Sequence, residues 1–89
     1  MTTEDPQARL KRMQMRSMRR GIKEMDLVLS AYAADNLAKM DPDELDLYDA
    51  LLSENDQDIH AWVIGQDTCP DRYSAMISKI AAHASARHA

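Results

Sequence analysis

Apolar residues recur along this chain at spacings of three and four positions, the pattern of amphipathic α-helices. The longest stripe follows the spacing i, i+4, i+7, i+11 and i+14, with three further positions that widen it: Met18, Ile22, Met25, Leu29 and Tyr32, then Val28, Ala33 and Leu37. A second stripe comprises Tyr73, Met76, Ile77, Ile80, Ala81 and Ala84. No stretch alternates apolar and polar residues as a half-buried strand would. The pattern predicts an all-α fold.

Two helix starts can be read from local signals. Asp5 followed by Pro6 predicts the N-cap and first residue of a helix that carries Leu10 and Met13 on its apolar face. This helix is either separated from the next by a tight turn near residues 17–20 or bends into it, and the sequence leaves both open.

The strongest local signal lies between residues 40 and 45. Asp41 is placed as N-cap, Pro42 as first helical residue and Glu44 as the returning carboxylate of a capping box. Met40 and Leu45 have the spacing of a hydrophobic staple across the same helix start. This helix should end near residues 54–55.

Two more helices are predicted beyond it. Asn55 or Asp56 caps a short helix, and Gly65 is placed for a left-handed stop. The inner face of this short helix comprises Ile59, Trp62 and Val63. Pro70 can start the last helix, which carries the second apolar stripe.

The expected architecture is one all-α domain over residues 1–89, a compact bundle of about five short helices with frayed ends at 1–5 and 85–89. Composition agrees, with 45% hydrophobic residues, no Phe, two glycines and three prolines.

The single Cys69 excludes an internal disulfide and fits a reducing compartment. No apolar run approaches the roughly 20 residues needed to span a bilayer, so we expect no membrane insertion.

Charge is distributed unevenly. Residues 1–24 carry seven basic and three acidic side chains, whereas the rest carries four basic and twelve acidic ones. Two solvated faces are the simpler interpretation, and steering onto a partner is the other.

We find no catalytic or metal-binding constellation in the sequence and predict that the chain is not an enzyme. Two glycines exclude a phosphate-binding loop or a dinucleotide fingerprint. Cys69 has no motif partner, and the histidines lack metal-ligand spacing. We expect His60 at the surface or rim and His83 and His88 in the tail.

A second hypothesis is a small helical regulator that binds nucleic acid or a toxin-like protein through the basic residues 9–23. The overall pI near 5.2 and the absence of aromatic residues among the basic ones argue against nucleic acid.

One of the two glycines of the chain, Gly21, lies within the charged stretch Arg19-Arg20-Gly21-Ile22-Lys23-Glu24. On a helix, Arg20, Gly21 and Glu24 would share one face, because they occupy positions i, i+1 and i+4. Glycine disfavours helix interiors, so its place between an Arg and a Glu suggests a flat spot where another chain approaches closely.

These residues fit an R-G-x-x-E signature and resemble the succinate dehydrogenase FAD assembly factor family (SdhE-like). Arg19 supplies a doubled arginine, and Met25-Asp26 stands where Leu-Asp is usual in that family. Residues 56–65, DQDIHAWVIG, resemble the family's D-x-D-(apolar)-x-x-W-(apolar)-x-G segment, and paired leucines lie in residues 45–52. The resemblance covers residues 18–80.

This resemblance implies a helical protein that binds the flavoprotein subunit of succinate dehydrogenase, and in bacteria often that of fumarate reductase. It implies that the chain promotes covalent attachment of FAD to a histidine of that subunit, so the FAD belongs to the client and the chain needs no cofactor of its own. The implied partner-binding residues are Arg19, Arg20, Gly21, Glu24 and Asp26.

From these implied roles we expect Arg20 to pair with a client carboxylate or carbonyl, and Glu24 with a client donor. The alternative is an internal Arg20–Glu24 pair at the surface. The absence of a long Arg- and Ser-rich leader favours a bacterial cytoplasm as the location.

Overall fold

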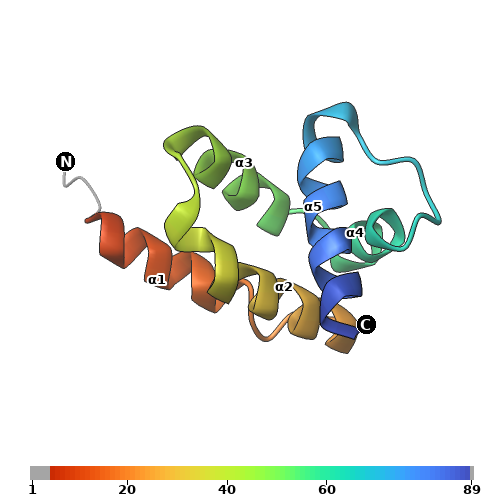
Figure 1. Cartoon of the computed structure of the whole chain (residues 1–89), viewed down its shortest axis with the longest axis horizontal. Helices are drawn as coiled ribbons and strands as arrows, with labels where there is room; N and C mark the ends of the chain where they lie inside the picture. The colour runs from red at the N-terminus through yellow and green to blue at the C-terminus, as the bar shows by residue number, and fades with distance from the viewer. Residues whose placement is uncertain (1–4, 89) are drawn as a thin grey trace.

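The computed structural model describes residues 5–88, which form five α-helices and one 3-10 turn, with no strand (Figure 1). In chain order these are α1 (Pro6–Arg16), α2 (Lys23–Asn36), η1 (Leu37–Lys39), α3 (Pro42–Leu52), α4 (Asp56–Val63) and α5 (Asp71–His88). The predicted all-α bundle of about five short helices is confirmed. It measures 41 × 26 × 23 Å.

Helix α2 is the element around which the others pack. It contacts α1, η1, α4 and α5, and α5 also contacts α3 and α4. In Figure 1, α5 crosses the beginning of α2 steeply, while α3 lies on the same side of the molecule as α1 and η1. Every α-helix contributes to the buried core, which comprises Met13, Met25, Leu29, Tyr32, Ala33, Leu37, Tyr48, Leu51, Leu52, Ile59, Tyr73, Met76, Ile77 and Ile80. No helix in residues 5–88 is both long and apolar enough to cross a membrane.

The helix starts follow the predicted capping chemistry. Asp5 accepts a backbone N–H at the start of α1, and the Asp41 carboxylate accepts the Glu44 N–H at 2.8 Å at the start of α3. Asn55, one of the two predicted caps, accepts the Gln57 N–H at 2.8 Å. Capping of this kind satisfies N–H groups that have no partner inside the helix. These caps depend on residues two or three apart, which is why sequence finds them.

A turn at residues 17–22 settles the question left open about the first two helices, because it separates α1 from α2. Met18 was expected in the core stripe, but its side chain is 43% exposed because it lies in this turn. Ser17 is fully buried there, and its hydroxyl donates to the Met13 carbonyl at 2.9 Å and contacts the Tyr48 hydroxyl at 2.7 Å.

The ends of the chain differ from the expected fraying where they are described. Helix α5 continues through residues 85–88, because no breaker interrupts its alanine-rich sequence. At the other end Asp5 is ordered as the N-cap of α1, and residues 1–4 lie outside the described residues.

The basic and acidic halves of the chain face each other within the fold. Arg9 of α1 lies 2.7 Å from the Asp46 carboxylate of α3. Arg16 pairs with Asp49, and Arg12 lies 3.9 Å from the same carboxylate. The charge asymmetry thus joins two helices instead of marking two independent solvated faces, and it leaves fewer unpaired cations on α1 for an external phosphate.

Candidate functional site

The stretch from Arg19 to Glu24 is a turn that leads into α2, not one helical face. Arg20 and Gly21 lie between α1 and α2, and Glu24 lies in the first turn of α2. The φ of Arg19 is 54°, in the left-handed region that a right-handed helix cannot contain. The prediction that Arg20, Gly21 and Glu24 share one helix face is therefore wrong.

Arg20 lies mostly inside the molecule, with a side chain that is 11% exposed. Its Nε and Nη2 donate to Asp56 Oδ1 at 2.8 and 2.5 Å. Its Nη1 donates to the Arg16 carbonyl at 2.8 Å and its Nη2 to the Leu52 carbonyl at 3.0 Å. The guanidinium therefore links the ends of α1 and α3 to the beginning of α4.

Gly21 completes this arrangement through its backbone. Its N–H donates to the second Asp56 oxygen, Oδ2, at 2.6 Å. A Cβ on residue 21 would stand 3.3 Å from that same oxygen, closer than an ordinary contact. Glycine therefore lets the Asp56 carboxylate approach the backbone, and we call this arrangement the Arg20–Asp56–Gly21 clamp.

The clamp revises the roles predicted for Arg20. Its guanidinium is expected from sequence to face a client or to pair with Glu24. In the structure Asp56 and two backbone carbonyls occupy it. The Arg20 side chain is 11% exposed, and its bonds on three sides hold the turn in place.

Asp56 is the site residue that sequence reasoning missed. It was considered only as a helix cap, but Asn55 performs that function and leaves both Asp56 oxygens for the clamp. A signal was present, because Asp56 opens the second segment that carries the family resemblance. The clamp therefore brings the two motifs together across 36 positions of sequence.

The remaining predicted site residues are more accessible. Arg19, Gly21 and Glu24 are exposed, whereas the other two clamp residues, Arg20 and Asp56, are half-buried. Asp26 is half-buried and accepts the Ser30 hydroxyl at 3.1 Å, a contact within α2. An open hollow of about 310 Å³ adjoins the turn and is lined by Gly21, Ile22, Asn55, Asp56 and Gln57.

Titratable groups also lie away from the turn, among them Cys69 and His83. Burial raises the pKa of the Cys69 thiol, with a smaller contribution from Asp71, so the thiol is protonated and poorly nucleophilic at neutral pH. Residues 5–88 contain no group of three His, Cys, Asp or Glu side chains arranged to hold a metal ion. His83, expected in the tail, lies within α5, where its Nε2 is 2.7 Å from Asp35 Oδ2 and its ring packs edge-on against Tyr32.

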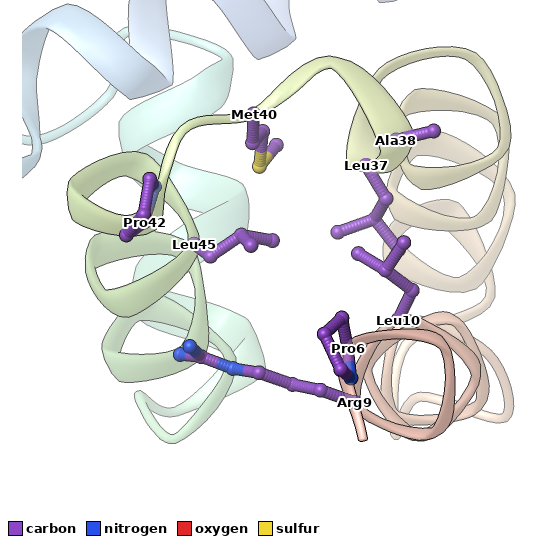
Figure 2. A pocket seen from close by; sticks show the side chains of 8 residues that line it. All are labelled: Pro6, Arg9, Leu10, Leu37, Ala38, Met40, Pro42 and Leu45. Carbon is purple, nitrogen blue, oxygen red and sulfur yellow. The ribbon is translucent and has the colours of Figure 1, made fainter. Parts of the chain in front are cut away.

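An apolar pocket of about 340 Å³ lies at the other end of α1, between α1, η1 and the beginning of α3 (Figure 2). Figure 2 shows Leu10, Leu37, Met40 and Leu45 pointing into it, while the Arg9 side chain reaches across towards α3. The predicted Met40–Leu45 staple forms part of this lining.

Comparison with known proteins yields one family and several fungal relatives. The family described as flavinator of succinate dehydrogenase matches residues 11–84. The protein named succinate dehydrogenase assembly factor 2, mitochondrial, is 40% identical over 74 residues in Yarrowia lipolytica, covering 80% of this chain and 51% of the relative. Its counterpart in Cryptococcus neoformans is 35% identical over 85 residues, covering 93% of this chain and 49% of the relative. The counterpart in Candida glabrata is 57% identical over 47 residues, covering 53% of this chain and 31% of the relative.

The chain therefore spans between 31% and 51% of the length of these relatives. The expectation of a bacterial cytoplasmic protein is contradicted, because the relatives are fungal proteins named as mitochondrial. The match over residues 11–84 includes both motifs that the clamp joins. The chain belongs to the family of flavinators of succinate dehydrogenase.

Proposed function

We propose that this chain binds the flavoprotein subunit of succinate dehydrogenase and promotes covalent attachment of FAD to it. Two findings support this proposal. The chain matches the family described as flavinator of succinate dehydrogenase, and its relatives are named as succinate dehydrogenase assembly factors. The flavoprotein of fumarate reductase is a second client of the same kind that the family resemblance implies.

The Arg20–Asp56–Gly21 clamp is the observation that carries the proposal. It holds a turn in one conformation by four hydrogen bonds from Arg20 and one from Gly21. A partner that meets such a turn does not have to order it, which lowers the entropic cost of binding. We assign Arg19, Glu24 and the Gly21 backbone to client contact, and Arg20, Asp56 and Asp26 to positioning.

In this proposal the chain contributes geometry and no reacting group. The flavin and the histidine that receives it both belong to the client, so the chain needs no cofactor of its own. By binding one conformation of the client, the chain raises the population in which flavin and histidine are aligned. Alignment of two reacting groups can by itself accelerate a reaction by many orders of magnitude.

Reconstitution from purified components tests the proposal. The flavoprotein subunit without flavin is incubated with FAD, with and without the chain, and covalent flavin is read as fluorescence of the denatured subunit. We expect faster accumulation with the chain, and slow accumulation with Asp56→Ala because the clamp loses its acceptor. Asp46→Ala is the matched control, since it removes an aspartate–arginine pair at the other end of α1. Equal rates with and without the chain would refute the proposal.

A further inference from the structure

We propose that Met15, Met18 and Arg19 form the anchor by which the chain docks on the flavoprotein subunit. This inference rests on the proposed function and deepens it, because it names an apolar contact that neither motif contains. We call these three residues the methionine edge.

The methionine edge is exposed although two of its members are apolar. Met15 is 61% exposed and Met18 is 43% exposed, and both are among the few large apolar side chains that the fold leaves in water. Together with Arg19 they line a shallow hollow of about 90 Å³. This is smaller than the roughly 150 Å³ of a cavity that admits benzene, so its size suits one aliphatic side chain. Methionine side chains adapt their shape to such a guest.

Arg19 is held in an unfavourable backbone conformation at this edge. Its φ of 54° lies in the left-handed region, which glycine adopts freely and arginine rarely does. Its side chain is exposed and has no hydrogen-bond or ion-pair partner among residues 5–88. A residue that holds an unfavourable backbone conformation and leaves its guanidinium without a partner among residues 5–88 is suited to an external contact.

The charges around the edge indicate the chemistry of the occupant. Arg12 and Arg16 on α1 are directed at Asp49 of α3. Lys11 lies one helical turn before Met15 and is exposed. Like Arg19, it has no hydrogen-bond or ion-pair partner among residues 5–88. Two free cations therefore flank two methionines. The matching surface on the flavoprotein subunit is an aliphatic side chain beside carboxylates, because unlike charges at the rim favour the encounter and fix its register.

Arg19→Gly separates docking from folding. Glycine adopts φ near 54° without strain, so this variant should be at least as stable as the wild type while it lacks the guanidinium. Calorimetric titration into the purified flavoprotein subunit should show a Kd raised about tenfold or more, and the same is expected of Met15→Ser with Met18→Ser. Leu27→Ser is the control, because Leu27 is 63% exposed on α2 and does not line the hollow. It should bind as the wild type does.

The outcomes separate this inference from the proposed function. Tight binding by the wild type with unchanged binding by both edge variants would overturn the inference and leave the proposed function standing. No binding by the wild type would overturn both. Sedimentation of the chain alone tests whether a second copy of the chain occupies the methionine edge instead. A wild-type dimer that becomes a monomer in the edge variants would assign the edge to that second copy and overturn the inference.

Discussion

At the scale of single residues, Asp56 explains the arginine and the glycine of the first motif together. One carboxylate oxygen accepts from Arg20 and the other from Gly21. The sequence identifies Arg20 and Gly21 because they are adjacent in a recognisable signature. It does not identify Asp56 as their partner, because no local rule brings residues 35 and 36 positions apart into contact. Capping rules also assign Asp56 a different task, which Asn55 performs.

Replacing Arg20 by lysine tests the fork of hydrogen bonds. Lysine keeps the charge but cannot reach Asp56 and two carbonyls at once, so Arg20→Lys should lose about 1–2 kcal/mol of unfolding free energy. Arg9→Lys should lose less than about 0.5 kcal/mol, because its partner Asp46 is 70% exposed. Urea denaturation of both variants measures the difference. Equal losses would mean that Arg20 does not position the turn.

The two glycines should respond oppositely to alanine. Gly65 has φ +78° and open space around it, so Gly65→Ala should cost about 1 kcal/mol of stability and leave client binding unchanged. At Gly21 the backbone suits alanine, whose entropic benefit offsets the close contact with Asp56, so stability should change by less than about 0.5 kcal/mol. Client binding by Gly21→Ala should fall, because the methyl group stands between the turn and its partner. Thermal unfolding and calorimetric binding measure the two effects, and a Gly21→Ala variant that binds normally would contradict this assignment.

At the scale of elements, the sequence predicts the helices well and their connections poorly. The starts of α1 and α3 follow from a cap and a proline that lie within three residues of each other. The turn between α1 and α2 does not follow from its own residues, because Met18 and Ile22 continue the apolar spacing of a helix. The turn forms because tertiary contacts outweigh that local preference, with Ser17 bonded to Tyr48 of α3 and Arg20 bonded to Asp56 of α4.

Burial of the Tyr48 hydroxyl makes the folded chain less stable at alkaline pH. Burial raises the pKa of Tyr48 from 10.0 to about 12 in the folded chain, although the hydrogen bond with Ser17 and the charge of Arg20 oppose the rise. Between pH 10 and 12 the unfolded chain releases this proton before the folded one, so unfolding becomes easier as pH rises. Below pH 10 this contribution is fully present, and about 2 kcal/mol should be lost by pH 12.

Urea denaturation at pH 9 and pH 11 measures this dependence, with Tyr48→Phe as control. The variant should show a smaller drop than the wild type over that interval. Some drop should remain, because burial also raises the pKa of Tyr32 and Tyr73. Identical drops in the two proteins would show that Tyr48 ionises equally in both states.

At the scale of the whole molecule, the unevenly distributed charges form ion pairs between helices as well as a surface that a partner could recognise. The net charge of −4 conceals the α1–α3 pairs and the clamp, which together use Arg9, Arg16 and Arg20. The total charge of each half was readable from sequence, but its pairing depends on how the helices pack. The predicted location, a bacterial cytoplasm, was wrong, because the relatives are fungal proteins named as mitochondrial. The single cysteine fits any reducing compartment and does not separate one from another.

We propose that the turn held by the clamp serves covalent flavinylation of succinate dehydrogenase. The most direct measurement is flavin fluorescence of the denatured flavoprotein subunit from cells that lack the chain, cells with it restored, and cells that carry Arg19→Ala with Glu24→Ala. Both substituted residues are exposed and do not belong to the clamp, so the variant should fold normally. We predict that covalent flavin falls without the chain, returns with the wild type and stays low with the variant. Full flavin with the folded variant, or unchanged flavin without the chain, would contradict the claim.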